Sequence, residues 1–361
     1  MKALILWADA RSGNLGVQAL GQGTSDLLER AFPGILVSFQ SYGPGDAPHS
    51  FDSRLLLGFR PRLFKELIDW IAEFDVVVDT GAGDSFADIY GLRRLVEMSS
   101  VREAVRRSGA PLVMGPQTYG PFRTRAGRTI ARTSLRSASL AFGRDPESIR
   151  YAGAELGRRI TPATDVAFAI EKSVADPSRS ILVNVSGLLW DPNPHVDNTY
   201  YRESLLQLTN GLHAKGYPVS LLAHVTDASN PDNDIYAIEQ FSKLLAEDPE
   251  ILVPSDLQDV RQMIASAKLV IGSRMHACLN ALSQGVPAIA WAYSRKFGPL
   301  LSGLNWEGVL DLRSSSPTIS RTTIELAEDL IDNGAPRVAQ VLEQAQSLNA
   351  TSVAMIRSAV K

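Results

Sequence analysis

Three side chains that could act on an anionic substrate lie within four residues of each other, Ser273, Arg274 and His276. They follow a short apolar run at residues 269–271, and the pattern predicts a strand, a Gly-Ser turn and a helix opening at Arg274. The first turn of a helix presents free N–H groups and the positive end of its dipole, which favour anions. Arginine adds a planar donor for carboxylate or phosphate, and histidine adds a group that titrates near neutrality. Residues 268–297 therefore predict an anion site with a proton carrier.

Residues of this stretch could also have purely structural roles, and the sequence alone does not decide between the two interpretations. A histidine on the first helical turn can be a cap or core-edge residue, so His276 need not be chemical. Cys278, the single cysteine, lies on an apolar helix face and is expected in the core rather than as a nucleophile. One cysteine also excludes an intramolecular disulfide or a cysteine zinc cage.

A second candidate anion site follows the first apolar run of the chain. Residues 3–8, ALILWA, predict a buried strand that leads into the glycine-rich loop DARSGNLGVQALGQG. Such a loop can cradle a phosphate or carboxylate, and Asn14 within it is a candidate substrate ligand. Its glycines are wrongly spaced for a dinucleotide fingerprint. A tight strand-to-helix turn is the structural alternative.

The next strand, DVVVDT, ends in the segment TGAGDSFADIYG. Ligands of open α/β sheets bind at the carboxyl ends of strands, so this segment is a candidate site. Gly81 and Gly83 permit close approach of a substrate, and Asp79, Asp84 and Asp88 supply carboxylates for sugar hydroxyls or base work. Each aspartate could instead be structural, and Asp84 could cap a helix turn.

Two further strand ends carry polar candidates. Gln117 lies in the predicted loop PQTYGPF at residues 116–122, and Gln117, Thr118 and Tyr119 are expected to face the same cleft. Arg144 ends the strand SLAFG and could bind an anion, or could pair with Asp145 or Glu147 on the surface.

The second half of the chain repeats the strand-helix pattern. After the apolar run at 181–187, the aromatic residues Trp190, Tyr200 and Tyr201 could stack on a sugar ring or pack a loop. Asp232 and Asp234 lie in the polar segment 226–234, which is expected to be a solvated loop entering a helix rather than a metal site. No metal is predicted.

Alternating strands and helices over 361 residues predict an α/β protein with two parallel doubly wound sheets. The first domain is predicted at residues 1–172 and the second at 173–335, with a polar linker at 173–180. A separate amphipathic helix at 336–361, following a helix at 319–333, is long enough to cross back to the first domain.

Composition excludes several classes of protein. A net charge of −3 and a pI near 6.0 argue against nucleic-acid binding as the main function. The sequence holds no apolar stretch long enough for a spanning helix and no signal-peptide pattern at its start, which favours a cytoplasmic location. A peripheral visit to a membrane-bound substrate stays compatible with this composition.

Several segments, in order, resemble the polysaccharide pyruvyl transferases: GNLGVQAL, GAGDSFAD, MGPQTYGPF, GRDPES with TDVAF, and SRMHACLNALSQGVP. The sequence differs from the family pattern at Val17 and Gln18, where acidic residues are common, and at Ala82 and Ala277, where glycine is common. The resemblance implies two Rossmann-like domains facing a cleft, similar to B-type glycosyltransferases. It also implies transfer of pyruvate from phosphoenolpyruvate to a saccharide, or a lipid-linked saccharide, as a ketal.

On this resemblance we assign Arg274 and Arg144 to the donor's phosphate and carboxylate, and His276 to general acid-base work. Asp84 and Asp88 become candidates to orient the acceptor. Phosphoenolpyruvate is a substrate, so no cofactor is implied. The alternatives are a nucleotide-sugar-dependent B-type glycosyltransferase and an inactive member that binds a phosphosugar.

Overall fold

The computed structural model describes residues 1–9, 11–176, 178–227 and 231–360. Residues 228–230 of the expected loop at 226–234, and residue 177 of the expected linker, lie outside the described residues. The chain forms two compact units. The first consists of Met1–Arg11, Leu20–Ile170 and Ala345–Lys361, and the second of Ser12–Ala19 and Glu171–Gln344.

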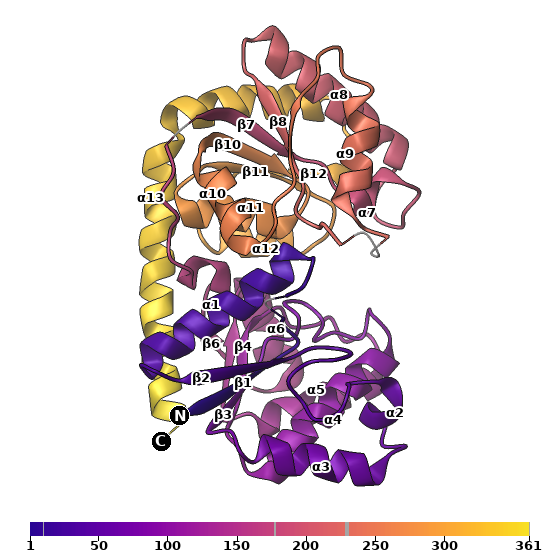
Figure 1. Cartoon of the computed structure of the whole chain (residues 1–361), viewed down its shortest axis with the longest axis vertical. Helices are drawn as coiled ribbons and strands as arrows, with labels where there is room; N and C mark the ends of the chain where they lie inside the picture. Colours follow the sequence, from indigo (N-terminus) through magenta and orange to yellow (C-terminus); the bar gives the residue numbers. More distant parts are fainter. Residues whose placement is uncertain (10, 177, 228–230, 361) are drawn as a thin grey trace. The chain divides into compact units, whose positions relative to one another are not determined.

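The first unit is built on a six-stranded parallel sheet with the order β2-β1-β3-β4-β5-β6 (Figure 1). The strand order reverses between β1 and β3, so the carboxyl ends of these two strands form the topological switch point of the sheet. The strands are β1 (Lys2–Leu6), β2 (Leu36–Gln40), β3 (Val76–Asp79), β4 (Leu112–Gln117), β5 (Leu140–Gly143) and β6 (Thr161–Pro162).

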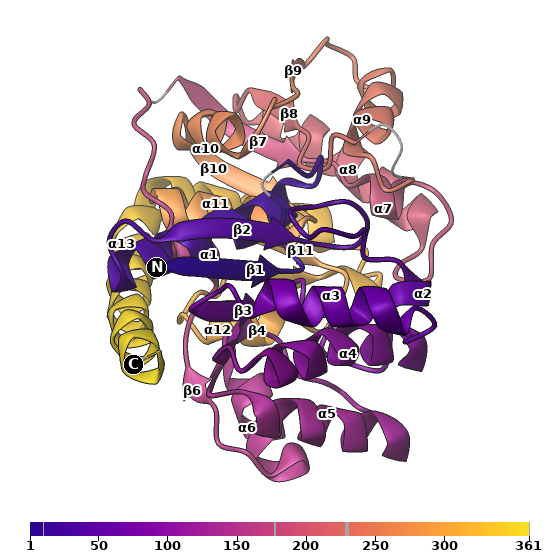
Figure 2. The same cartoon turned by 60° about the horizontal axis from the view of Figure 1, so that its bottom comes forward.

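Both faces of this sheet are buried, because apolar side chains alternate between two core clusters. Leu4 and Leu6 of β1 join one cluster, and Ala3 and Ile5 join the other. Figure 2 shows α3, α4 and α5 side by side on the first of these faces. That face carries α2 (Ser53–Leu56), α3 (Pro61–Ile71), α4 (Leu92–Ser108), α5 (Arg125–Ser137) and α6 (Pro146–Leu156), and the other carries α1 (Leu15–Ala31) and the 3-10 turn Val166–Ala169.

The second unit has a six-stranded parallel sheet with the order β12-β11-β10-β7-β8-β9. This is the order of a Rossmann sheet, and it reverses between β7 and β10. The prediction of two Rossmann-like parallel-sheet α/β domains is confirmed. The strands are β7 (Arg179–Asn184), β8 (Val219–Leu222), β9 (Glu250–Leu252), β10 (Ala267–Gly272), β11 (Ala288–Ala292) and β12 (Val309–Asp311).

Polar side chains cap several helices of this unit, as their amino-terminal N–H groups require. Asp197, Asn233 and Asp256 each accept a hydrogen bond from the first turn that follows them. The helices are α7 (Gly187–Trp190), α8 (Asn198–Ala214), α9 (Asp234–Ser242), α10 (Leu257–Ala265), α11 (Met275–Gln284), α12 (Phe297–Ser302) and α13 (Ile319–Ala359), with a 3-10 turn at Leu312–Ser314.

The prediction of two separate terminal helices is wrong, because α13 is continuous through Pro336. A proline inside a helix removes one backbone hydrogen bond. Buried Leu330 and Val338 on either side of Pro336 continue one apolar face. At Gly334 a Cβ would lie 2.8 Å from Pro287 Cγ, so the glycine serves close helix packing rather than a helix end.

The predicted first domain, residues 1–172, included the glycine-rich loop, whereas the structure groups Ser12–Ala19 with the second unit. Backbone bonds account for this grouping. Leu15 N donates to His224 O at 3.2 Å, Thr226 N donates to Gly13 O at 2.9 Å, and Asn14 pairs with Val225 in an antiparallel bridge. The loop therefore extends the carboxyl edge of the second sheet.

At the switch point of the first sheet, Asp79 ends β3 and is fully buried. Its carboxylate accepts hydrogen bonds from Arg102 Nε at 2.6 Å, Gly81 N at 2.7 Å and Trp7 Nε1 at 3.3 Å. The Arg102 guanidinium also lies 4.4 Å from the centre of the Phe86 ring. One buried ion pair thus joins β1, β3 and α4.

We predict that Asp79→Ala destabilises the protein by about 3–5 kcal/mol, because Arg102 is left as a buried charge without its carboxylate. Urea unfolding should show this loss, and adding Arg102→Met to the variant should recover part of it. Glu103→Ala on the same helix removes ion pairs to Arg106 and Arg107, whose side chains are 55% and 54% exposed, and should cost less than about 1 kcal/mol. Equal losses in the two single variants would contradict the assignment.

Candidate active site

The candidate site lies where β7 and β10 adjoin in the second sheet and the strand order reverses. Gly272 of β10 is in register with Asn184 of β7, and a Cβ at Gly272 would lie 3.3 Å from Asn184 Cβ. Just beyond, Arg274 N donates to Asn184 Oδ1 at 2.9 Å. The two strand ends are thereby locked together at the position where Rossmann sheets bind ligands.

A buried carboxylate fixes the Arg274 side chain. Asp234 Oδ1 accepts from Arg274 Nη2 at 2.8 Å and from Nε at 3.1 Å, while the carbonyl of Asp232 accepts a further bond from Nη2. Burial alone would lower the pKa of Arg274, but the Asp234 charge outweighs it and raises the pKa above its ordinary value. The Arg274 side chain is 11% exposed, so it is held in place without being closed off.

The expectation that Asp234 lies in a solvated loop is wrong, because Asp234 is fully buried as the first residue of α9. Its Oδ2 accepts from His224 N at 2.9 Å and Val225 N at 3.0 Å, and Oδ1 accepts from Gly187 N at 2.9 Å. Among the described residues, no group of three or more His, Cys, Asp or Glu side chains is arranged to hold a metal ion. Asp234 is thus an anchor for Arg274.

His276 lies in the first turn of α11 and is half-buried. The first turn of α1 covers its ring, since a Cβ on Gly16 would lie 2.7 Å from His276 Nδ1, and the expected glycine-rich loop is helical from Leu15 onward. Gly16 N donates to Asn14 Oδ1 at 3.0 Å, which fixes the loop at this position. The structure therefore brings the predicted site residues Asn14, Arg274 and His276 together in one unit. Gly16 serves this close approach.

Gln18, one of the departures from the family pattern, is buried in the first turn of α1 and ties this segment to its neighbours. Its Oε1 accepts from Leu257 N, the first residue of α10, at 2.9 Å, and its Nε2 donates to Ser12 O at 2.6 Å. The amide supplies one acceptor and one donor to two backbone groups. An uncharged residue fits this pair of partners.

His224 is a site residue that the sequence left without a role. It is buried just after β8, and its Nε2 lies 3.1 Å from Asn280 Nδ2. An amide nitrogen can only donate, so Nε2 accepts and the ring proton belongs on Nδ1. Burial first, and then the charges of His276 and Arg274, lower the pKa of His224 to about 3. The only sequence signal was its place at the carboxyl end of a strand.

The segment after β11 adds groups that sequence reasoning also missed. Tyr293 stacks edge-on against His195, with ring centres 5.2 Å apart. Burial lowers the pKa of His195, the charge of Lys296 lowers it further, and Asp232 partly opposes both. Asp232 is the residue whose carbonyl accepts from Arg274, so Lys296 and His195 belong to the same polar region. The signal for Tyr293 and Lys296 was again a position shortly after a strand, β11.

Other predicted residues of the second unit pack the core beside the site. Ser273 is buried and its Oγ donates to Tyr201 Oη at 3.3 Å. Tyr201 Oη accepts from Ser186 N, and Trp190 is covered by Arg202 at 4.6 Å from the ring centre. Tyr201 and Trp190 are buried, so the packing alternative holds for both. The expected core position of Cys278 is confirmed, and burial raises the pKa of its thiol to about 12.

In the first unit, the Arg144 side chain is only 1% exposed. Its Nη1 donates to Asp165 Oδ2 at 2.7 Å and its Nε to Thr118 Oγ1 at 3.1 Å. Asp145, the partner considered from sequence, instead caps α6 by accepting from Ser148 N. At Gly83, with φ of +82°, a Cβ would lie 3.3 Å from Arg144 Nη1. Arg144 therefore serves an internal ion pair.

Gln117 is fully buried as the last residue of β4, and the expectation that it lies in a loop and faces the cleft is wrong. Its Nε2 donates to Asp79 O at 3.1 Å. A Cβ on Gly81, where φ is +57°, would lie 1.9 Å from Gln117 Oε1. Gly81 thus makes room for a core amide, which is a structural reason for this glycine.

The two aspartates of the first unit differ in their engagement. Asp88 accepts from Arg123 N and Thr124 N, each at 2.8 Å, at the start of α5. Burial would raise the pKa of Asp88, but the bonds from Thr124 and Arg123 outweigh it and lower the pKa. Asp84 lies at the partly exposed loop and accepts from Tyr90 Oη at 2.8 Å. Asp88 is therefore committed to a structural role at the start of α5.

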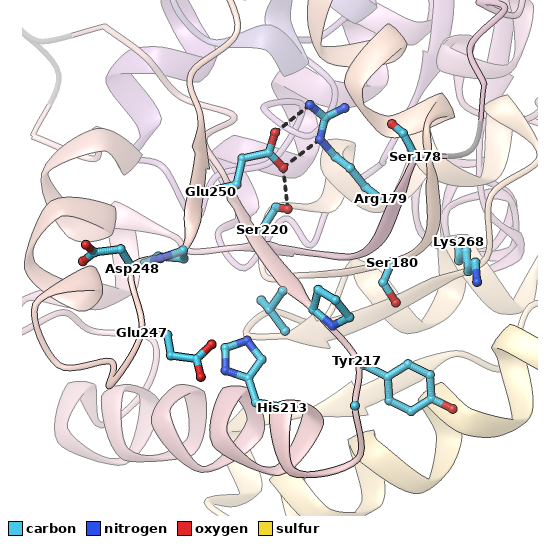
Figure 3. A pocket seen from close by; sticks show the side chains of 14 residues that line it. Ser178, Arg179, Ser180, His213, Tyr217, Ser220, Glu247, Asp248, Glu250 and Lys268 are labelled. Atoms are coloured by element: carbon cyan, nitrogen blue, oxygen red, sulfur yellow. Dashed lines mark hydrogen bonds and ion pairs between the residues drawn. The ribbon is translucent and has the colours of Figure 1, made fainter.

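A hollow of about 880 Å³ lies at the other edge of the second sheet (Figure 3). Its walls include the amino ends of the strands, with Arg179 beginning β7 and Glu250 beginning β9. Arg179 Nη2 and Nε donate to the Glu250 carboxylate at 2.7 and 2.9 Å, and Ser220 Oγ donates to it at 2.7 Å. These charges are mutually satisfied, and Rossmann sheets bind ligands at their carboxyl edge, so the hollow is not the candidate site.

Two parallel α/β domains with this strand order define the architecture shared by B-type glycosyltransferases and UDP-GlcNAc 2-epimerases. A putative UDP-N-acetylglucosamine 2-epimerase from Listeria monocytogenes matches with a TM-score of 0.57 and 12% identity, over 95% of this chain and 90% of that one. Anabaena HepE in complex with UDP-glucose matches with a TM-score of 0.52 and 14% identity, over 100% of this chain and 98% of that one. At these identities the likeness shows the fold alone.

The sequence carries the narrower assignment. A model of the family "Polysaccharide pyruvyl transferase" matches residues 14–295, and the chain belongs to this family of transferases. The amylovoran biosynthesis protein AmsJ of Erwinia amylovora is 23% identical over 258 residues, which are 65% of this chain and 61% of that protein. The match ends at Arg295, so it includes the Arg274 and His276 region as well as the glycine-rich loop.

The low pKa of His224 gives a pH prediction. The folded protein keeps His224 neutral down to about pH 3, whereas in the unfolded chain it takes a proton near pH 6.5. Below pH 6.5 the unfolded chain therefore binds more protons than the folded protein. The free energy of unfolding should fall by about 1.4 kcal/mol for each pH unit as the pH is lowered between these two values. His224→Gln keeps an acceptor for Asn280 and should lose this part of the slope in urea titrations. Equal slopes in the two proteins would contradict the burial of a neutral His224.

Proposed function

We propose that this protein transfers pyruvate from phosphoenolpyruvate to a saccharide and forms a cyclic ketal. The observation that supports this best is the pairing of a fixed cation with a half-buried histidine. Arg274 is held by Asp234 with two hydrogen bonds, and His276 follows two residues later on the first turn of α11. Both lie at the switch point of a Rossmann sheet in a chain of the pyruvyl transferase family.

Phosphoenolpyruvate carries a carboxylate and a phosphate and needs positive groups in fixed positions. The Asp234 carboxylate orients the Arg274 fork, so little reorganisation is needed when the anion arrives. Lys296 and the amino-terminal N–H groups of α11 supply further positive potential in the same unit. The internal ion pair of Arg144 leaves the second unit as the main source of donor charge.

The reaction balances with one general acid-base group. A proton from His276 adds to the donor's C3 methylene while a sugar hydroxyl attacks C2, so the double bond becomes a methyl group and a new C–O bond forms. Loss of the phosphate breaks its bond to C2, and a neighbouring sugar hydroxyl then attacks C2 to close the ketal. Of the two hydroxyl protons released, one replaces the proton lost from His276 and the other leaves with phosphate. The products are the ketal and inorganic phosphate.

Asp84 is the acid of the first unit that we assign to the acceptor. Its carboxylate lies in a partly exposed loop and accepts from Tyr90 Oη, whereas Asp88 is committed to the start of α5. A saccharide presents rows of hydroxyl donors, and a carboxylate can accept from two of them at once. A lipid-linked saccharide would offer the same hydroxyls.

The fold likeness favours one competing activity, transfer from a nucleotide sugar. HepE is described with UDP-glucose bound, and this chain shares its fold. A full chain incubated with phosphoenolpyruvate and candidate glycans should release inorganic phosphate and add a pyruvate ketal to the glycan by mass spectrometry. Release of UDP from a UDP-sugar with no turnover of phosphoenolpyruvate would instead establish the glycosyltransferase. Binding of phosphoenolpyruvate without any turnover would indicate an inactive member.

We predict that His276→Asn lowers turnover by about 10²–10⁴-fold, the usual contribution of a general acid or base. Calorimetric binding of phosphoenolpyruvate should change little, because Arg274 supplies the charge. Gln284→Asn, at the last residue of the same helix, is the control for a polar change on α11, and it should leave turnover close to that of the natural protein. Turnover of the His276→Asn variant within a factor of a few of the natural protein would exclude a proton-transfer role.

We predict that the double variant Arg274→Met with Asp234→Asn weakens phosphoenolpyruvate binding by about 10–100-fold, as expected for lost charge-assisted hydrogen bonds. The pair is changed together because Arg274→Met alone would leave Asp234 buried and uncompensated. The asparagine keeps an acceptor for His224 N and Val225 N. Unchanged calorimetric affinity in a folded double variant would remove Arg274 from the donor site.

A further inference from the structure

The first unit has a strongly basic stretch in an otherwise acidic chain. Residues 89–144 hold eleven arginines against two glutamates, Glu97 and Glu103, with no lysine or aspartate, whereas the whole chain has a net charge of −3. This stretch contains α4 and α5, which lie side by side in Figure 2. Arg102 and Arg144 are buried in internal ion pairs, so the other nine arginines account for the basic surface of this stretch.

Five of these arginines follow the start and length of α5 and form what we call the arginine row. Among the described residues, no carboxylate lies within ion-pair distance of any of them. Arg128 and Arg132 donate to backbone carbonyls, of Phe122 and Glu155. The nearby Asp88 is engaged by backbone N–H groups. The row consists of Arg123, Arg125, Arg128, Arg132 and Arg136.

An exposed apolar patch adjoins the row. Its four members lie within eight residues at the start of α4 and are 38–48% exposed, namely Ile89, Tyr90, Leu92 and Val96. Asp88, next to Ile89, is tied by 2.8 Å hydrogen bonds to Arg123 N and Thr124 N. Ser99 and Ser134 join α4 to α5 further along. The patch and the beginning of the row are therefore neighbours.

We propose that this face of the first unit docks reversibly on an anionic lipid bilayer. The arginines meet the negative headgroups, and the apolar patch gains from leaving water at the boundary with the acyl chains. Tyrosine has an apolar ring with a polar tip and suits this depth of the bilayer. Among the described residues, no helix is long and apolar enough to cross a membrane, so the contact is one with its surface.

The apolar patch distinguishes a bilayer from other polyanions. A nucleic acid or an acidic polysaccharide would use the arginines, but four exposed aliphatic and aromatic side chains would gain little from a hydrated polymer. Stable attachment to a bilayer needs two weak signals together, such as a basic patch and an apolar insertion. Both are present within one pair of helices. The proposal does not depend on the donor chemistry.

The test is sedimentation of the full chain with vesicles of equal parts phosphatidylglycerol and phosphatidylcholine, compared with phosphatidylcholine alone. We expect binding to the anionic vesicles only, and weaker binding as salt rises. Arg123→Gln with Arg125→Gln should weaken the partition by about fivefold per arginine. Leu92→Ser with Val96→Ser should weaken it comparably while the row stays intact. Circular dichroism should show both double variants folded.

Matched controls lie elsewhere on the surface. Arg62→Gln with Arg321→Gln removes two arginines whose side chains are 92% and 73% exposed, and Val174→Ser removes an apolar residue that is 91% exposed. Neither control should change sedimentation. Binding that depends on the row but not on Leu92 and Val96, with equal affinity for heparin, would replace the bilayer with an acidic polymer. A concentration-dependent dimer that the patch variants abolish, without vesicle binding, would make the face a self-association surface and also overturn the proposal.

Discussion

The hydrogen bonds and the ion pair of the buried Asp234 carboxylate hold together the candidate site at the carboxyl edge of the second sheet. A buried carboxylate is costly unless donors surround it. Asp234 collects them from three strand ends: the Asn184 amide at the end of β7, the N–H groups of His224 and Val225 after β8, and the Arg274 guanidinium after β10. The charge therefore does two things at once. It fixes the spacing of the strand ends at the switch point, and it holds an arginine in one orientation.

The same carboxylate organises the glycine-rich loop, although the two do not touch. His224 connects them, because its N–H donates to Asp234 and its carbonyl accepts from Leu15 N. Leu15 precedes Gly16, whose backbone lies against the His276 ring. A segment from the beginning of the chain is thus a wall of the site in the second unit. Gln18 then anchors this wall to α10, which gives an uncharged residue a role at a position where the family commonly carries an acid.

Local signals in the sequence were enough for the fold, and they singled out Arg274 and His276 as candidates. Apolar runs flanked by glycine located the strands, and the segment after β10 carried its anion-site pattern within four residues. Partners distant in sequence could not be found this way. Asp234 stands in a polar segment that reads as solvated, yet it meets Arg274 forty residues later. Gln117 and Asp88 were assigned to a substrate for the same reason, because a polar residue at a strand end can serve either a ligand or a backbone group. Gly334 and Pro336 read as a helix end because packing on Pro287 is a tertiary contact.

Arg144 and Arg274 show why pairing alone does not identify a functional arginine. Each donates to an aspartate at 2.7–2.8 Å, and each partner is fully buried. The difference is in what remains accessible. The Arg144 side chain is 1% exposed, whereas that of Arg274 is 11% exposed and stands two residues before a half-buried histidine. An arginine whose side chain is fully buried stabilises its own unit. An arginine that is fixed by a buried carboxylate but stays partly exposed can present an oriented charge to an anion. The positive charge for a phosphorylated donor is therefore best placed in the second unit, where the fold already supports it.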